Sequence, residues 1–170
     1  WGSGASGTVQ LTETVTATGC ATATANYNVT INPLPTPVIS GLNAVCANQA
    51  GVIYTTPNVG GHTYVWAITG GAITGGAGTN SITVTWGTAG AGTLQLTETI
   101  TATTCAVTTA FYNVTKNPNP TPVISGPATV CASDAGDVYS TVNVVGNSYS
   151  WTVSGGTITA GAGTNSITVT

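Results

Sequence analysis

Apolar and polar side chains alternate along residues 93–103. Leu94, Leu96 and Ile100 fall on one parity, and threonines or a glutamine fall on the other. A period of two predicts a long β-strand with one buried and one solvated face. Glu98 breaks the pattern, because its carboxyl group lies on the apolar parity. We expect this carboxylate to find hydrogen-bond donors, to lie at the rim of the core, or to mark a bulge that turns it outward.

Shorter apolar runs lie between turns rich in glycine and proline, and Gly70-Gly71 is a hairpin signal between two of them. Helix-favouring residues are scarce, whereas Thr, Val, Ile and Gly are abundant, so the composition predicts an all-β fold. Many short strands with frequent turns are typical of a β-sandwich. The expected strands of one sandwich are residues 38–41, a short run to 46, 52–56, 64–68, 72–74, 81–86, 93–103 and 106–115.

The chain repeats with a period of 85 residues, and 55 of the 85 aligned positions are identical between its two halves. Such self-similarity predicts a tandem array of one structural unit. Tyr64 and Trp66 share one face of an expected middle strand, and they recur as Tyr149 and Trp151. We predict that these four aromatic residues lie in the core rather than on a sugar-binding surface. The other predicted core residues are Ile82, Val84, Leu94 and Leu96.

Trp1 and Trp86 also recur, each directly before a glycine-rich turn. Besides a place in the core, this position leaves packing between domains or stacking on a ligand open for both indole rings. The sequence favours the core for both residues, with the other two roles as alternatives.

Two proline-rich linkers, residues 33–36 and 118–121, are the predicted domain boundaries, because alternate prolines fix φ and remove backbone donors. Between them, residues 37–117 are expected to form a complete β-sandwich repeat. Residues 1–32 match its closing strands and residues 122–170 match its opening strands. A half-sandwich alone would expose its core and its strand edges. Either the polypeptide continues at both ends, or the tail of one subunit is completed by the head of the next; both give a linear polymer.

Charged residues make up only 3 % of the chain, with a single lysine and no arginine. The chain therefore has no basic patch, and we expect no nucleic-acid partner. It also has no apolar run long enough to cross a bilayer, so no membrane insertion is expected. Scarce charge removes most of the repulsion that keeps proteins apart. This composition suits a protein that packs against copies of itself.

The four cysteines recur as two per repeat, with Cys20 and Cys105 in one role and Cys46 and Cys131 in the other. Their spacing matches no zinc motif, and no metal or other cofactor is expected. Paired cysteines in a threonine-rich β protein indicate structural disulfides and a secreted, extracellular location. A Cys46–Cys105 bridge within one sandwich is the first expectation, although these positions lie at opposite ends of a simple sandwich. A bridge between consecutive repeats is the alternative.

No nucleophile–base–acid set recurs in both copies, so we expect no enzymatic activity. Glu98 recurs as Glu13, but His62 is replaced by Asn147. A hydrogen-bonded structural role is therefore predicted for the glutamate, and a catalytic or metal-binding role for His62 is not.

Two Asn-x-Thr sequons begin at Asn28 and Asn113 and recur in phase, which makes both asparagines candidates for glycosylation. An isopeptide cross-link would need a lysine in each unit, but the counterpart of Lys116 is Ile31.

Several motifs recur together along nearly the whole chain. Tyr-x-Trp-x-Val/Ile-x-Gly-Gly occurs at 64–71 and 149–156, the run GAGTNSITVT begins at 76 and at 161, and Pro-x-Pro-x-Ile-Ser-Gly opens a repeat at 120. With the long threonine strand, this combination resembles the PKD-like, immunoglobulin-like repeats. The resemblance implies a tandem array of β-sandwiches in a large secreted surface protein of gliding bacteria, an adhesin exported through the type IX route.

Some PKD domains bind calcium. That property is not carried over, because Asp134 and Asp137 are replaced by Gln49 and Val52 in the other copy.

The sequence favours a structural role in an extracellular filament or adhesin stalk, with copies of the same unit as the partners. The alternative is a binding module that uses the threonine-rich strand faces to hold polysaccharide or ice. Alternating threonines suggest such a regular surface, but an uncharged β-sheet also needs a hydroxyl-rich face for solubility.

Overall fold

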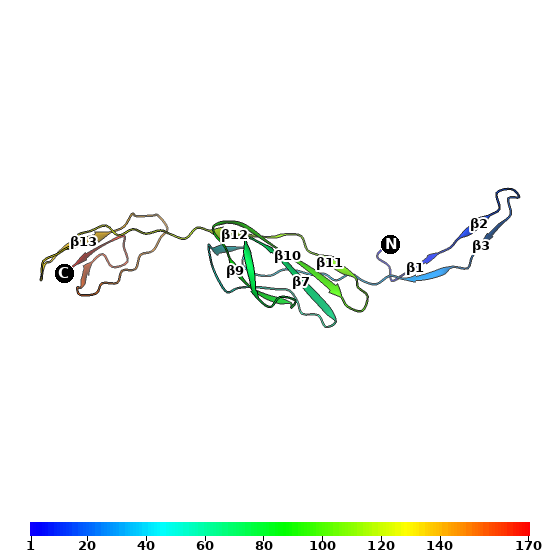
Figure 1. The fold of residues 1–170 in the computed structure, drawn as a ribbon, viewed down its shortest axis with the longest axis horizontal. Helices are drawn as coiled ribbons and strands as arrows, with labels where there is room; N and C mark the ends of the chain where they lie inside the picture. Colours follow the sequence, from blue (N-terminus) through cyan, green and yellow to red (C-terminus); the bar gives the residue numbers. More distant parts are fainter. The chain divides into compact units, whose positions relative to one another are not determined.

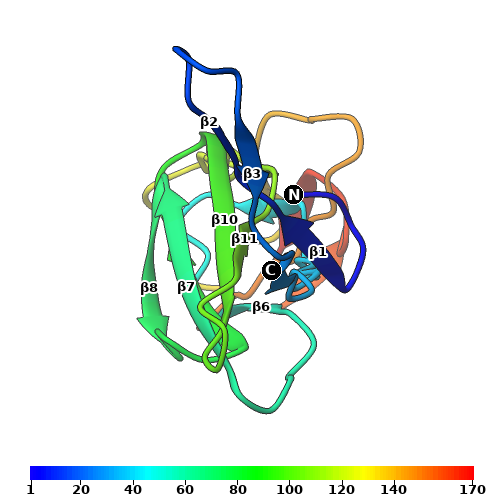
Figure 2. The ribbon, with the colours of Figure 1, turned by 90° about the vertical axis from the view of Figure 1, so that its right-hand side faces the viewer.

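The long alternating stretch forms strand β10 (Gly90–Ile100) in the computed structural model, which describes residues 1–170. β10 ends at Ile100 because a turn follows, in which the Thr104 amide donates to the Ile100 carbonyl at 2.8 Å and Thr104 has φ 58°. It is the central strand of a five-stranded sheet (Figure 2). The other strands are β7 (His62–Thr69), β11 (Ala106–Thr108), β12 (Tyr112–Asn117) and β5 (Ala44–Cys46).

β7 pairs with β10 along one edge, and β11 and β12 share the other edge. The expected single strand 106–115 is therefore two strands. Thr109 lies between them, where its amide donates to the Leu96 carbonyl at 2.8 Å and its own carbonyl accepts from the Gln95 amide group at 2.9 Å. β5 pairs with β12 in parallel, so the opening and the closing segments of the repeat lie side by side.

A second sheet of three strands faces the first. β9 (Ser81–Trp86) pairs with β6 (Val52–Thr55) on one side and with β8 (Gly71–Gly75) on the other. Figure 1 shows the two layers, with β10 and β12 in one and β9 in the other. The predicted all-β fold and β-sandwich architecture are confirmed.

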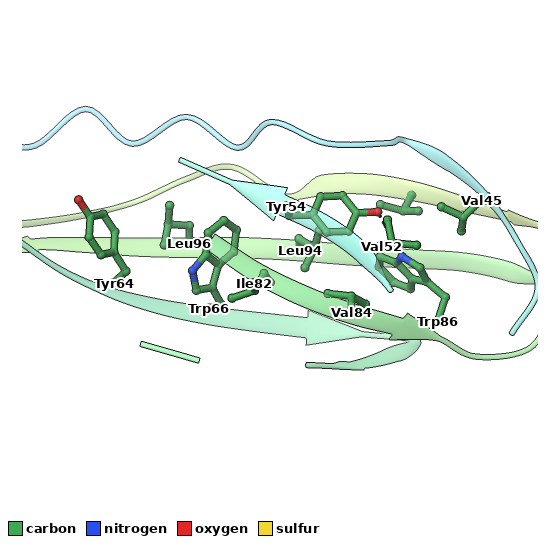
Figure 3. Close-up of a cluster of buried hydrophobic side chains, with 11 residues drawn as sticks. Val45, Val52, Tyr54, Tyr64, Trp66, Ile82, Val84, Trp86, Leu94 and Leu96 are labelled. Atoms are coloured by element: carbon green, nitrogen blue, oxygen red, sulfur yellow. Dashed lines mark hydrogen bonds between the residues drawn. The ribbon is translucent and has the colours of Figure 1, made fainter. Parts of the chain in front are cut away.

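Alternate side chains of both sheets point inward and form one core (Figure 3). Period-two sequences place every second residue on that face, which is why the predicted apolar parity is the buried one. The core residues are Val45, Val52, Tyr54, Tyr64, Trp66, Ile82, Val84, Trp86, Leu94, Leu96 and Val114.

The chain divides into two compact units, Trp1–Asn119 and Pro120–Thr170. Near the start of the first, residues 8–18, the counterpart of the expected strand 93–103, do not form one continuous strand, and the counterpart of the expected strand 106–115 is divided as well. These strands form two small antiparallel pairs, β1 with β4 and β2 with β3. Their bounds are β1 (Ser6–Val9), β2 (Thr12–Thr14), β3 (Ala21–Ala23) and β4 (Tyr27–Thr30).

The second unit contains a three-stranded sheet, which corresponds to the sheet of β6, β9 and β8. The counterpart of β7 in this unit is not a strand, because β7 is held in the complete repeat by pairing with β10. The strands of the unit are β13 (Asp137–Ser140), β15 (Ser166–Val169) and β14 (Ile158–Ala160).

Candidate functional site

The complete repeat, residues 37–117, has two poles. At the N-terminal pole, Pro35 of the incoming linker is buried, and residues 34–36 line a hollow of about 280 Å³ with His62, Glu98 and Ile100. At the C-terminal pole the outgoing chain is fixed to the opening segment. There the Ala47 amide donates to the Asn117 carbonyl at 2.7 Å, and the Asn119 side-chain amide donates to the Ala47 carbonyl at 3.1 Å.

Cys105 and Cys46 lie at these two poles. Cys105 lies at the N-terminal pole, because its carbonyl accepts from the Ile100 amide at 2.9 Å, whereas Cys46 pairs with Asn117 at the C-terminal pole. β10 has 11 residues between them, which at about 3.3 Å per residue separates the poles by roughly 30 Å. A disulfide needs Cα atoms within about 7 Å. The expected Cys46–Cys105 bridge is therefore wrong, and both thiols are free, as are Cys20 and Cys131.

The carboxylate that broke the alternation is buried at the N-terminal pole. Glu98 is 3 % exposed, and its Oε1 atom lies 2.6 Å from Nδ1 of His62, which stands at the start of β7 opposite Ile100. The two side chains form a hydrogen bond at the rim of the core. It gives the glutamate the hydrogen-bond partner that the sequence pattern required. No group of three His, Cys, Asp or Glu residues gathers in the chain.

The aromatic residues divide between the two ends of the core. Trp66 donates from Nε1 to the Thr79 carbonyl at 2.8 Å, and the Tyr64 hydroxyl accepts from the Val59 amide at 2.8 Å. At the opposite end, Trp86 is only 1 % exposed, so the structure places it in the core rather than on a ligand-stacking surface. The counterparts Tyr149 and Trp151 are only partly buried.

Tyr54 is the core aromatic residue that the sequence analysis missed, although its alternation with Val52 was a usable signal. Its ring packs edge-on against Trp86 with centroids 6.0 Å apart (Figure 3). Its hydroxyl donates to the Leu42 carbonyl at 2.8 Å and accepts from Trp86 Nε1 at 3.2 Å. Burial raises the pKa of Tyr54, and the Trp86 hydrogen bond partly offsets that rise.

Lys116, the single cationic side chain of the chain, is buried on the inward parity of β12. It is 6 % exposed, and its ammonium donates to the Gly70 carbonyl at 2.9 Å. This contact ties the end of β12 to the β7–β8 turn. The ammonium therefore has a structural partner.

The outer face of the larger sheet carries the threonines. The hydroxyls of Thr69 and Thr93 lie 2.8 Å apart across β7 and β10, and those of Thr97 and Thr108 lie 2.8 Å apart across β10 and β11. Hydroxyl groups that pair with each other are partly satisfied without a ligand. The sequon asparagines Asn28 and Asn113 are both exposed on their strands.

The chain was compared with protein families. The sequence model of a family described as a PKD-like domain matches two segments, residues 32–114 and 117–170. A comparison with curated proteins gives no significant match. The structure contains no helix long and apolar enough to cross a membrane.

Proposed function

The chain belongs to the PKD-like domain family, and from that premise we propose that it is a non-enzymatic structural repeat unit of an extracellular filament or adhesin stalk. The family supports an immunoglobulin-like extracellular module. The gliding-adhesin type is the form we propose, because tandem repeats of this kind and scarce charge suit a long surface fibre.

One observation carries the proposal: the complete repeat buries its own core while the chain passes through it from pole to pole. The linker packs at the N-terminal pole, and the outgoing strand is fixed at the C-terminal pole. Repeats connected in this way extend in one direction when a short proline-rich linker joins each pair. Each 85-residue period then contributes one sandwich to the array.

The cysteine positions support a covalent array. Cys46 lies at the pole where the chain leaves a repeat, and Cys105 lies at the pole where the chain reaches one. Because Cys46 and Cys105 lie too far apart to bond within one sandwich, we propose that the structural disulfides join consecutive repeats at their junctions. Each bridge forms when two thiols pass two electrons and two protons to an oxidising disulfide, which becomes a dithiol.

Location on the cell surface is the direct test. Antibodies raised against residues 37–117 should label intact, non-permeabilised cells by immunogold microscopy, along fibres or a surface layer. Label that requires permeabilised cells would overturn the proposal. The mass of the native polypeptide after denaturation and reduction then distinguishes one continuous array of very large mass from assembled subunits.

Peptide mapping without reduction tests the junction disulfides. The peptide that contains Cys46 should be linked to a hairpin cysteine of another repeat. A link between Cys46 and Cys105 of the same sandwich, or free thiols throughout the native material, would contradict the assignment.

The threonine faces offer a second candidate role, in binding ice or polysaccharide. The hydroxyl pairs Thr69–Thr93 and Thr97–Thr108 give the sheet a regular polar surface, although they also satisfy each other. Thermal hysteresis or ice-crystal shaping by the purified chain would favour ice binding, and the absence of both would exclude it.

A further inference from the structure

Strand β7 forms an open edge of the larger sheet in the complete repeat. It pairs with β10 on one side, and no strand is hydrogen-bonded to its other side. β8 follows β7 in the chain and appears beside it in Figure 2, but it belongs to the smaller sheet, where it pairs with β9. Alternate residues of an edge strand point their amide and carbonyl groups away from the sheet. The eight residues of β7 therefore offer a row of groups that can pair with another strand.

The other edges of the sandwich are short or protected. In the larger sheet, β5 and β11 have three residues each. In the smaller sheet, β8 has a register shift between Ile73 and Gly75. β6 is covered in part by Ser40, whose amide and carbonyl exchange hydrogen bonds of 2.9 Å with Thr55. Short strands, bulges and covering segments all discourage edge pairing, and β7 is the one long edge that has none of them.

The side chains of β7 do not block its edge either. Lysine and other charged side chains are a common protection of edge strands. β7 contains no lysine, arginine, aspartate or glutamate, and its histidine, His62, is bonded to Glu98. The residues on its outer face are exposed and uncharged: Thr63, Val65, Ala67 and Thr69. Nothing on this face therefore repels a second strand.

A second copy of the chain is the partner whose features match this edge. Two uncharged β7 strands bring no like charges together, and a chain with so few charged residues has little overall repulsion. In an array, the same edge recurs with each 85-residue period, so two arrays of equal period can pair at every repeat. The counterpart segment, residues 147–154, is also free of charge.

We propose that β7 of one copy pairs antiparallel with β7 of a second copy, so that the two larger sheets become one continuous sheet. The pleat restricts the register, because outer residues must lie opposite outer residues. A pairing centred on the strand therefore places Val65 opposite either Val65 or Ala67 of the second copy. This inference rests on the proposed function and deepens it, since it names the lateral partner of the array.

Sedimentation velocity of the 170-residue chain, kept reduced, over concentrations up to the millimolar range tests the proposal. The wild-type chain should associate as its concentration rises. Val65→Lys should weaken this association by about tenfold or more, because it places ammonium groups on both facing edges, where they repel each other. Val65 is 65 % exposed in the free chain, so the fold should be preserved, as circular dichroism can verify.

Thr115→Lys is the matched control. It adds the same charge at an exposed position of the same sheet face, but on β12, which is paired with β10 on one side and with β5 on the other. This variant should associate like the wild-type chain. The ends of the chain are the same in both variants, so the comparison cancels any association through them.

Amide hydrogen exchange locates the contact. Peptides that contain residues 62–69 should exchange more slowly as the concentration of the wild-type chain rises, because the free amides of β7 become paired. Peptides from β12 should not change. In the Val65→Lys chain, the protection of residues 62–69 should be lost at the same concentration.

A charge-swap experiment separates strand pairing from aggregation. Val65→Glu alone should associate as weakly as Val65→Lys alone, since each puts like charges on the facing edges. An equimolar mixture of the two variants should associate at least as strongly as the wild-type chain, because opposite charges then face each other across the new strand pair.

Three results would overturn the pairing: β7 amides whose exchange does not depend on concentration, equal loss of association in Val65→Lys and Thr115→Lys, or a mixture as weak as its components. The second result would indicate stacking of the outer faces instead. Surface labelling of cells is independent of these measurements. A labelled fibre made by chains that do not pair through β7 would leave the proposed function standing and reject only the lateral partner.

Discussion

Residues 86–117 of the complete repeat and residues 1–32 have closely similar sequences but very different burial. Trp86 is 1 % exposed and Trp1 is 78 % exposed, while the strand registers around them are the same. Hairpin pairing is local, so it forms wherever the sequence allows. Burial between two sheets needs the other half of the repeat. The contrast shows that the register is a local property and that the core is a property of the whole repeat.

The second unit shows that strand formation in the opening part of a repeat also depends on partner strands. The three strands β13, β14 and β15 persist because they pair with each other. Residues 147–154 have the alternation of β7 but form no strand. Partner strands, and not propensity alone, decide whether such a segment becomes a strand.

The largest expected difference between the two regions is at the paired tryptophans. Trp86→Ala should lower the free energy of unfolding of residues 37–117 by about 3–5 kcal/mol, because it empties a filled core site. Trp1→Ala should change the same free energy of unfolding by less than about 0.5 kcal/mol, because the Trp1 side chain is largely exposed. Urea unfolding followed by near-ultraviolet circular dichroism measures both values. Similar losses in the two variants would contradict the comparison.

Removing the partner of the buried carboxylate should have a smaller effect. His62→Ala leaves Glu98 without its hydrogen-bond partner and should cost about 1–3 kcal/mol of unfolding free energy. His62→Asn introduces the residue found at the equivalent position, Asn147, and retains a donor. It should cost less than the alanine variant under the same urea titration. An alanine variant as stable as the parent chain would show that the pairing contributes nothing.

Tyr54 and Tyr139 provide a comparison that depends on pH. Since the pKa of Tyr54 is raised in the folded state, the unfolded chain releases that proton at lower pH, near the ordinary value of about 10. The free energy of unfolding is thus unaffected below that pH and falls as the pH rises above it. Tyr54→Phe should remove this part of the pH dependence and cost about 1 kcal/mol at neutral pH.

Tyr139→Phe is the matched control, because Tyr139 is the counterpart of Tyr54 and is only partly buried. Phenolate absorbance should show a late-titrating tyrosine that disappears in Tyr54→Phe and persists in Tyr139→Phe. The opposite pattern would contradict the assignment.

The smallest effect is expected at Lys116. Lys116→Ile introduces the residue of the other copy, and it should change the free energy of unfolding by less than about 1 kcal/mol, because losing the contact with Gly70 offsets the relief of a buried ammonium. Lys116→Ala should cost more, since it also removes the packed alkyl stem. A large loss in the isoleucine variant would show that the charge itself is required.

Alternation predicted the faces of β7, β9 and β10, and with them Trp66, Ile82 and Leu96 as core residues. It did not predict the end of β10, because Thr101 and Ala102 continue the pattern. The strand ends there because a turn follows, in which the Thr104 amide donates to the Ile100 carbonyl at 2.8 Å.

The cysteine geometry was anticipated in part. A simple sandwich already put Cys46 and Cys105 at opposite ends, and the strand order, with β5 paired to the end of β12, decides against the bridge between them. The hydrogen bond of Glu98 could be anticipated, because a carboxylate on the apolar parity needs a donor. Its partner, His62, could be identified only from the register of β7 against β10.

The parallel pair of β5 and β12 has a mechanical consequence. Tension along the array would pull the opening segment toward the N-terminal pole and the closing strand toward the C-terminal pole. Because the two strands run side by side in the same direction, their hydrogen bonds would be loaded in shear, and several would have to break together. The repeat should therefore resist stretching by a high barrier to forced unfolding, independent of its equilibrium stability.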